Sequence, residues 1–364
     1  MKALVLSGGK GTRLHPLTYT NAKQLIPVAN KPVLFYALEK IVAAGIYEIG
    51  IVVGDTREEI IAAVGDGRQF GEQVSISYIH QEQPLGLAHA VKLAQPFLQN
   101  DRFLMFLGDN FIEEPLGELV AHFAAPDCLD HAQVCLTRVE APQQFGVALL
   151  SEEQERLVRV VEKPREPISD LAIVGVYLFD AHIFEAVNAI HPSARGELEI
   201  TDAIQYLIDR GYRVSPHLLR GYWIDTGRMQ DMLNANRTVL SQMQGALAPG
   251  VEIDERSCLY GEVVLEENVR LINSVVRGPS IIGRNVVLEN TYIGPFTSIA
   301  HDTVVMNSEI EHSIILEGCT IQAIGGRIED SLIGRHTQIY PTQGRPGAHR
   351  LLLGDHSSIG LMSA

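Results

Sequence analysis

The sequence predicts two domains of different architecture: an α/β domain built on a mostly parallel, twisted sheet, and a parallel β-solenoid. Three observations lead to this prediction. The 364 residues are too many for one ordinary hydrophobic core. Up to about residue 240, short β-rich apolar runs alternate with amphipathic helical stretches, as in doubly wound α/β sheets. Beyond residue 245, branched apolar residues recur every six positions, a period that neither helices nor hairpins produce.

The first domain, expected over residues 1–240, alternates strands with helices. The strands are expected at Ala3–Leu6, Ile49–Val53, Ser75–Ile79, Phe103–Leu107 and Val134–Val139. The helices are expected at Pro32–Ala44, Arg57–Val64, Leu87–Leu98 and Pro115–Phe123. In the helix at 32–44, Asn30 is expected to cap the start, Pro32 suits the first turn, and Gly45 can end it. Ligands of such sheets bind at the carboxyl ends of the strands, where the loop after Leu6 lies.

The second domain, expected over residues 246–364, follows a junction in residues 240–250. Its period of six is typical of a hexapeptide solenoid, in which one branched side chain per six residues points inward and stacked coils share a core. The expected inward residues are Val263, Val269, Val275, Ile281, Val287, Ile293, Ile299 and Val305, and then, after a slip of register, Ile315, Ile321, Ile333 and Ile339.

Composition limits the function. A formal net charge of −15 and a sequence pI near 5.3 argue against a general nucleic-acid-binding protein, so we expect small-molecule partners or further copies of the chain. The four cysteines show no paired spacing and are expected to be buried free thiols. No apolar run approaches the length of a membrane span, and no signal sequence is recognisable, so we expect a cytoplasmic protein.

The stretch "LSGGKGTRL" follows the first expected strand. It has Leu14 where a dinucleotide fingerprint needs its third glycine, and it lacks the Gly-Lys-Ser/Thr end of a P-loop. Three glycines still allow backbone N–H groups to approach anionic oxygens, and Arg13 offers a planar fork for phosphate. The stretch therefore predicts a phosphate-binding loop of another kind.

Six motifs occur in order along the chain: "LSGGKGTRLHPLT" with "KQLIPVANKP", then "GLAHA", "LGDN", "EKP", "RGELEITD" and "WIDTG". In this order and spacing they resemble the sugar-1-phosphate nucleotidylyltransferases, over essentially the whole chain. The resemblance is greatest to long members that carry a C-terminal left-handed β-helix and use dTTP with glucose 1-phosphate. It implies a Rossmann-like catalytic domain, Mg²⁺ as the only cofactor, and release of pyrophosphate as a nucleotide-sugar forms.

The resemblance also implies roles for particular residues. Catalytic roles fall to Arg13, Lys23 and Lys163, and Mg²⁺ would bind Asp109 and Asp225. Nucleotide contacts are implied for Leu6, Gly8, Gly9, Gly11, Thr12, Gln81 and Gly86. Sugar contacts are implied for Asn110, Gly146, Glu162, Lys163, Val174 and Tyr177, and with less weight for Glu197. The chemistry of two of these residues fits the implied roles. Asp109 ends an apolar strand, where a carboxylate needs a cation. The Gln81 amide complements the N3–H and carbonyl edge of thymine or uracil.

Alternatives remain open on sequence grounds. The nucleotide could be UTP instead of dTTP, with a broader range of sugars. The β-helix could be an acetyltransferase, with His301, His312 or His336 as its catalytic base, although we favour a structural role in a homo-oligomer formed through the β-helix or the catalytic domain. A regulatory subunit without activity should have damaged phosphate or metal motifs, and Arg13, Lys23, Asp109 and Asp225 are all present.

Overall fold

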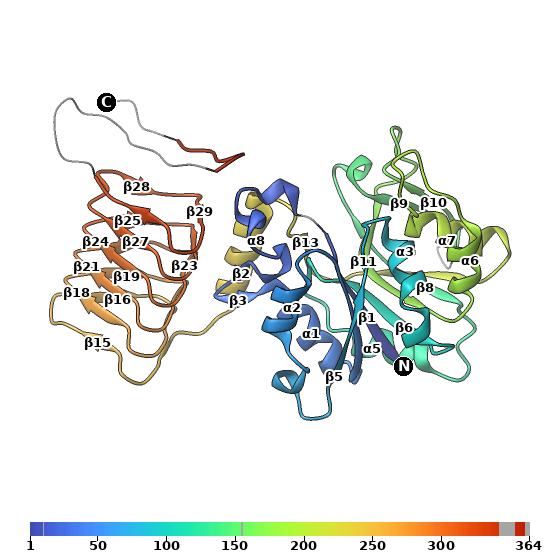
Figure 1. The fold of residues 1–364 in the computed structure, drawn as a ribbon, viewed down its shortest axis with the longest axis horizontal. Coiled ribbons are helices and arrows are strands. Elements are labelled where there is room, and N and C mark those ends of the chain that lie inside the picture. Colours follow the sequence, from blue (N-terminus) through green and yellow to red (C-terminus); the bar gives the residue numbers. More distant parts are fainter. Residues whose placement is uncertain (10, 154–155, 342–353, 361–364) are drawn as a thin grey trace. The chain divides into compact units, whose positions relative to one another are not determined.

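The computed structural model describes residues 1–9, 11–153, 156–341 and 354–360. The chain divides into two compact units (Figure 1). The first comprises Met1–Lys10, Ala22–Leu25 and Val33–Ile224, and the second comprises Gly11–Asn21, Ile26–Pro32 and Asp225–Ala364. The domain boundary expected near residues 240–246 stays a prediction. Among the described residues, no helix is both long and apolar enough to cross a membrane.

The first unit is an α/β fold around a nine-stranded sheet. The strands are β1 (Lys2–Ser7), β4 (Glu48–Val53), β5 (Ser75–His80), β6 (Phe103–Leu107), β8 (Ala132–Arg138), β9 (Gly146–Leu150), β10 (Leu157–Glu162), β11 (Leu171–Phe179) and β12 (Val214–Leu218). The helices are α1 (Val33–Ala43), α2 (Arg57–Val64), α3 (Leu87–Leu93), α4 (Gln95–Leu98), α5 (Gly117–Ala124), α6 (Ile183–Ala189) and α7 (Ile200–Asp209). A separate two-stranded sheet joins β7 (Asn110–Ile112) to β13 (Trp223–Asp225).

Four neighbouring strands, in the order β6-β1-β4-β5, run parallel. Strand β11 lies antiparallel to β6 on the other side. Successive side chains of a strand point to opposite faces, and in β1 Leu4 and Leu6 enter one hydrophobic core while Ala3 and Val5 enter another. The sheet is therefore covered on both faces, which explains why its central strands read as continuous apolar runs.

All five strands expected in this unit are confirmed to within two residues at each end, and the Arg57–Val64 helix is confirmed as α2. Two details were wrong. Asn30 does not cap α1: it lies with φ 61° between β2 (Pro27–Val28) and β3 (Lys31–Pro32), and its amide donates to the Ile299 carbonyl at 2.9 Å. The helix expected at 87–98 is interrupted at Ala94, because Pro96 has no N–H to continue the hydrogen-bond ladder of α3.

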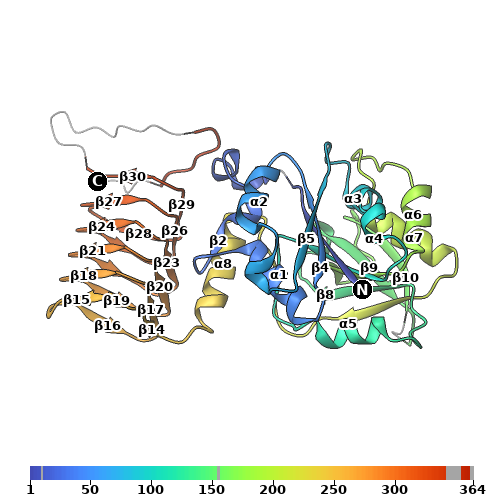
Figure 2. The same ribbon diagram turned by 60° about the horizontal axis from the view of Figure 1, so that its bottom comes forward.

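The second unit contains α8 (Met229–Leu240) and a β-helix of three all-parallel sheets, as expected for a left-handed β-helix (Figure 2). The first sheet holds β14 (Ala246–Leu247), β17 (Val263–Leu265), β20 (Ser280–Ile282), β23 (Thr297–Ile299), β26 (Ile314–Ile315) and β29 (Leu332–Ile333). The second holds β15 (Glu252–Ile253), β18 (Arg270–Ile272), β21 (Val287–Glu289), β24 (Val304–Met306), β27 (Thr320–Gln322) and β30 (Gln338–Ile339). The third holds β16 (Cys258–Tyr260), β19 (Val275–Arg277), β22 (Tyr292–Ile293), β25 (Glu309–Ile310) and β28 (Arg327–Ile328).

The strict count of six was wrong in part of the solenoid. Three steps of six residues would make each coil 18 residues long. In the middle coils, stacked residues such as Asn273 and Asn290 are instead 17 positions apart, so the count slips by one residue. The core consequently contains Val276, Ile282 and Leu288 in place of the expected Val275, Ile281 and Val287. Ile281 instead packs in a small cluster with Ala29 and Leu240. The cysteine expectation was also only half right, since Cys135 and Cys319 are buried whereas Cys258 is exposed and Cys128 half-buried.

Candidate active site

The carboxyl ends of the four parallel strands meet at one edge of the first unit. Gly8 follows β1, Gly54 follows β4, Gln81 follows β5, and Asp109 follows β6. The backbones are close there: a Cβ atom on Gly54 would lie 3.1 Å from the Gly8 carbonyl oxygen, and one on Gly8 would lie 3.2 Å from Gln81 Oε1. The structure therefore brings three of the sequence-predicted residues, Gly8, Gln81 and Asp109, to the edge where ligands of such sheets bind.

The glycine-rich loop begins at this edge. The side chain of Leu6 is buried in the core, so only its backbone can face a ligand. A Cβ atom on Gly9 would meet nothing within 4 Å, which leaves that backbone open for an anion. Gly11, with φ 61°, precedes a short 3₁₀ turn at Thr12–Leu14. The loop thus keeps the bare backbone that phosphate binding requires.

Arg13 and Asp225 lie together in the second unit. The Arg13 Nη2 atom is 3.9 Å from Asp225 Oδ2, and its side chain is 56% exposed. A Cβ atom on Gly227 would lie 2.6 Å from the same guanidinium nitrogen, so the "DTG" glycine makes room for the arginine. The arginine side chain is long and exposed, and the planar guanidinium at its end is suited to binding a polyanion.

Lys23 and Asp109 form a short ion pair in the first unit. The Lys23 Nζ atom lies 2.6 Å from Asp109 Oδ2, with the lysine side chain 6% exposed and the aspartate 25% exposed. Burial alone would raise the pKa of Asp109, but the charge of Lys23 and hydrogen bonds from Lys23 and Asn110 lower the pKa overall. Asp109 is therefore ionised at neutral pH, and Lys23 supplies the cation that this partly buried carboxylate needs.

Asn110 holds Asp109 in place. Its Nδ2 atom donates to Asp109 Oδ1 at 3.0 Å, while its Oδ1 accepts from the Gly175 N–H at 3.1 Å and from Trp223 Nε1 at 2.6 Å. A Cβ atom on Gly175 would lie 2.7 Å from Asn110 Oδ1, so this approach requires glycine. Asn110 thus connects Asp109 to Gly175 and Trp223, and the sugar contact expected of it stays a prediction.

Gln81 is buried and has a fixed orientation. Its Nε2 atom donates to the Gly86 carbonyl at 3.3 Å and lies 2.9 Å from His89 Nδ1. Burial, and then the charge of Lys92, lower the pKa of His89, which keeps its imidazole neutral and able to accept this hydrogen bond. Because both amide hydrogens are directed to protein acceptors, the carbonyl oxygen on the Gly8 side is the group presented to a ligand.

Glu162 is the centre of a second group of predicted residues. Its Oε1 atom lies 3.3 Å from Lys163 Nζ and 3.1 Å from Arg195 Nη1. A Cβ atom on Gly146 would lie 3.3 Å from Glu162 Oε2 and 2.9 Å from Thr201 Cγ2, so the glycine keeps this space open. Lys163 adopts φ 39°, an uncommon conformation that directs a half-exposed ammonium next to this carboxylate.

The remaining sugar candidates have different environments. The side chain of Val174 is fully buried in a hydrophobic core cluster, so it cannot itself line a ligand pocket. Tyr177 is also buried, and burial raises its pKa strongly. Glu197 accepts from Arg195 Nη2 at 2.9 Å, which makes it a partner of that arginine.

Sequence reasoning missed three residues of these groups: His89, Arg195 and Trp223. His89 stands inside "GLAHA", Arg195 inside "RGELEITD" and Trp223 inside "WIDTG". Arg195 carried the strongest signal, because carboxylates follow it at positions 197 and 199 and both pair with it. His89 and Trp223 act through Gln81 and Asn110, and no spacing rule reveals such a contact.

Known proteins resemble this chain in sequence and in fold. The family model described as nucleotidyl transferase matches residues 2–242. The chain is 54% identical over 365 residues to a glucose-1-phosphate thymidylyltransferase of Streptomyces griseus and 51% identical to one of Streptomyces antibioticus, with all of each chain covered. A crystal structure from Bacillus anthracis, described as a glucose-1-phosphate thymidylyltransferase in complex with sucrose, matches 68% of this chain and 97% of its own, with a TM-score of 0.61 and 34% identity. With the family model matched over residues 2–242 and a relative 54% identical over the whole chain, this chain belongs to the nucleotidyl transferase family.

Proposed function

We propose that the protein transfers the nucleotidyl group of dTTP to glucose 1-phosphate, giving dTDP-glucose and pyrophosphate. The observation that carries this proposal is the 54% identity over full length to the Streptomyces griseus relative of that name. The oriented Gln81 amide supports it independently, because its outward carbonyl oxygen suits the N3–H of a thymine or uracil base and not the N3 acceptor of cytosine.

The reaction needs no protein nucleophile. The second pKa of a phosphate monoester is near 6, so at neutral pH a phosphate oxygen of the sugar phosphate is already anionic. This oxygen forms a bond to the α-phosphorus as the bond from the α-phosphorus to the bridging oxygen breaks, and pyrophosphate leaves with that electron pair. The work left to the protein is to bring two polyanions together and to stabilise the charge.

The cationic residues divide this work. Arg13 would bind the triphosphate and the departing pyrophosphate, while backbone N–H groups of Gly8, Gly9 and Gly11 approach its oxygens. Lys23 is held by Asp109 at 2.6 Å, so it would face the reacting phosphates without a costly change of conformation.

Mg²⁺ would bind Asp109 and Asp225, whose carboxylate oxygens are the ligands that this ion prefers. The fit rests on the ionised state of Asp109, which the charge of Lys23 and then the hydrogen bonds from Lys23 and Asn110 maintain by lowering its pKa. When bound, the ion supplies neutralising charge to the phosphate oxygens. Asn110, through its 3.0 Å hydrogen bond, orients the carboxylate for this role.

On the sugar side, Lys163 would bind the phosphate of glucose 1-phosphate, and Glu162 would accept from a sugar hydroxyl. Arg195 holds Glu162 from the other side, so it would position this carboxylate. The glycine at 146 keeps the approach to Glu162 free of a side chain.

Replacing Lys163 with methionine should raise the KM for glucose 1-phosphate by roughly 30-fold, because a charged hydrogen bond contributes about 2 kcal/mol. The KM for dTTP should change less than about twofold in initial-rate measurements, since the residue would not touch the nucleotide. The matched control is Arg165→Met, which removes an exposed cation two residues away and should leave both constants unchanged. An unaltered sugar-phosphate KM in the Lys163 variant would disprove the assignment.

The His89→Phe substitution should raise the KM for dTTP by about fivefold while kcat and the KM for glucose 1-phosphate stay within about twofold. The phenyl ring removes the acceptor that orients Gln81 but preserves a planar side chain. Discrimination against CTP should also fall, because a freed amide can turn its NH₂ group outward. His89→Asn restores an acceptor and should recover most of the loss; equal defects in both variants would mean that His89 serves packing only.

A direct test of the function is product analysis. The purified protein with Mg²⁺, dTTP and glucose 1-phosphate should form dTDP-glucose and pyrophosphate in equal amounts, measured by ion-exchange chromatography. Release of pyrophosphate without glucose 1-phosphate, or absence of any product, would contradict the proposal.

For the β-helix we propose a structural role in a homo-oligomer. Short open sheet edges at the ends of a coil stack need covering, and a second copy of the chain can cover them. Light scattering should therefore give a mass above that of one chain, and a monomer would contradict the proposal. CoA-dependent acetylation of an amino-sugar phosphate would support the acetyltransferase alternative.

A further inference from the structure

Three side chains of the first unit, which no step of the proposed reaction uses, converge on one point. His131 directly precedes β8, Asp180 directly follows β11, and His182 is the N-cap of α6. Asp180 Oδ2 lies 2.9 Å from His131 Nδ1 and 3.0 Å from His182 Nδ1. The two imidazole Nδ1 atoms are 3.2 Å apart. Two nitrogens and one carboxylate oxygen thus form a nearly equilateral triangle.

This triangle has the dimensions of a transition-metal site. Zinc binds histidine nitrogens and carboxylate oxygens at about 2.0–2.2 Å, usually in tetrahedral geometry. An ion at such distances from all three atoms would lie about 1 Å out of their plane, and its fourth position would be left for water. The three side chains are 32%, 15% and 43% exposed, for His131, Asp180 and His182, so an ion can reach them from solvent.

The same three atoms serve either hydrogen bonding or metal binding. With a proton on each Nδ1, both imidazoles donate to Asp180 Oδ2, and Asp180 Oδ1 also lies 3.0 Å from His182 Nδ1. With the protons on Nε2, the two Nδ1 lone pairs and the carboxylate oxygen meet at one point, and a cation is attracted by all three at once.

The surroundings hold the imidazoles in place. The Tyr212 ring packs against His131 at 5.0 Å and against His182 at 4.7 Å between centroids, and its hydroxyl donates to Glu185 at 2.9 Å. The Asp180 N–H donates to the His131 carbonyl at 3.0 Å, and Asp180 Oδ1 accepts from the His182 N–H at 2.9 Å. The geometry is therefore fixed without an ion.

The cluster is separate from the candidate active site. Phe179, the last residue of β11, pairs with Phe103, the first residue of β6. Asp180 consequently lies at the amino-terminal edge of the parallel strands, whereas Asp109 follows the carboxyl end of β6. Since the two sites are at opposite edges of one sheet, an ion bound here would not take part in the phosphate chemistry.

We propose that His131, Asp180 and His182 bind one Zn²⁺ ion, which ties the start of β8 to the end of β11 and the start of α6. Two imidazoles and one carboxylate favour zinc over the magnesium that the phosphate site would use. The ion stabilises the fold of the first unit and leaves catalysis unchanged.

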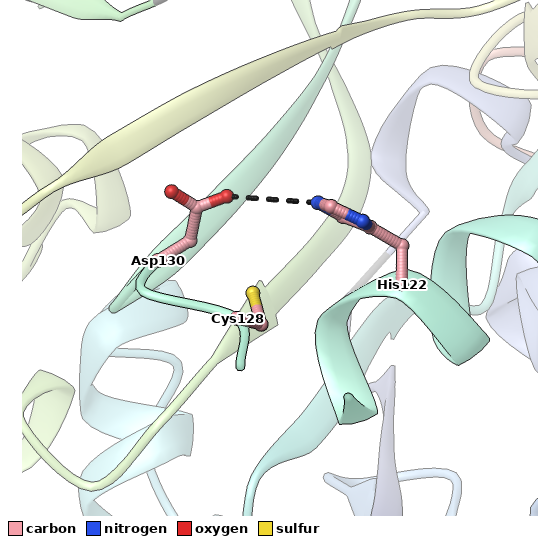
Figure 3. A group of neighbouring side chains, drawn as sticks. All are labelled: His122, Cys128 and Asp130. Atoms are coloured by element: carbon pink, nitrogen blue, oxygen red, sulfur yellow. Dashed lines mark ion pairs between the residues drawn. The ribbon is translucent and has the colours of Figure 1, made fainter. Parts of the chain in front are cut away.

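A second group, His122, Cys128 and Asp130, is less suited and serves as the control (Figure 3). Asp130 Oδ1 is already paired with Arg213 Nε at 2.7 Å, and Asp130 Oδ2 accepts from Ser215 Oγ at 2.8 Å. His122 Nε2 lies 4.0 Å from Asp130 Oδ2. Both carboxylate oxygens of Asp130 already have protein partners, which an ion bound there would have to displace.

The test is zinc titration of the metal-free full-length protein against a competing chromophoric chelator, in excess Mg²⁺ to occupy the phosphate site. The wild type should bind one more Zn²⁺ per chain than the His182→Ala and Asp180→Asn variants. Zinc should raise the thermal midpoint of the wild type and leave the midpoints of these two variants unchanged. His122→Ala should match the wild type. Thymidylyltransferase activity with Mg²⁺ should be equal in all four proteins, which separates this test from that of the proposed function.

Cobalt replaces zinc as a spectroscopic probe. Bound at the proposed site, Co²⁺ should give tetrahedral visible bands without a thiolate charge-transfer band in the near ultraviolet, because the ligand set has no sulfur. Equal zinc stoichiometry in the wild type and the His182 and Asp180 variants would overturn the proposal. So would a thiolate band lost on Cys128→Ser, which would assign the ion to the other group.

Discussion

Replacing Asp225 with asparagine should lower kcat by about 1000-fold at saturating substrates and Mg²⁺, because the proposed metal site loses one of two carboxylates where charge develops. Asparagine has nearly the same shape, so the thermal midpoint should change little. The Mg²⁺ concentration for half-maximal rate should rise, since an amide oxygen binds a hard cation more weakly than a carboxylate. Initial rates across a Mg²⁺ titration measure both effects.

The matched control is Asp170→Asn. Asp170 forms an exposed ion pair with Arg138 at 2.6 Å, far from any role in the proposed chemistry, and such pairs contribute little to stability. Its rate should stay within about twofold of the wild type. A near-normal rate and Mg²⁺ dependence in the Asp225 variant would remove this residue from the metal site.

Replacing Gly86 with alanine is expected to have the second large effect, a loss of stability of the folded protein. Gly86 adopts φ 104°, and a Cβ atom there would lie 2.7 Å from the backbone nitrogen of Leu198 and closer still to its carbonyl oxygen. The neighbours cannot yield easily, since Leu198 N–H donates to the Leu85 carbonyl at 2.7 Å and its carbonyl accepts from Ala88 N–H at 3.1 Å. We expect a loss of about 3 kcal/mol in the free energy of unfolding.

Catalysis should suffer in the same variant. The Gly86 carbonyl accepts from Gln81 Nε2, so a shifted backbone also releases the amide proposed to read the base. Gly9→Ala is the control for stability, because its Cβ would meet nothing within 4 Å. Thermal unfolding of both variants makes the comparison; a Gly86 variant as stable as the Gly9 variant would mean that the close approach to Leu198 is easily relieved.

The sequence predicted the elements whose pattern is local. The central strands carry continuous apolar runs, and α2 has a turn before it and Gly65 after it, so their positions follow from residues nearby. The β-helix was predicted from its period, but its register was not, because stacked residues of the middle coils are 17 positions apart and not 18. Asn273, Asn285 and Asn290 have positive φ, and their side chains bond from coil to coil.

Residues expected to touch the ligand could be named from the sequence, whereas residues that act through another residue could not. Lys23 and Asp109 were named separately, yet their pairing across 86 positions was not foreseen. Asn30 illustrates the opposite error: a good capping residue by local rules instead bonds to Ile299, 269 positions away. Long-range contacts override local preference at these positions.

The most direct test of the central claim is pyrophosphate release across a full panel of substrates with Mg²⁺. Each of dTTP, UTP, CTP, GTP and ATP would be paired with the 1-phosphates of glucose, glucosamine, N-acetylglucosamine, galactose and mannose. The proposed function predicts the highest kcat/KM for dTTP with glucose 1-phosphate. In Gln81→Leu, the preference for nucleotides with thymine or uracil over those with other bases should be lost. A purine nucleotide as the best substrate, or no release with any pair, would contradict it.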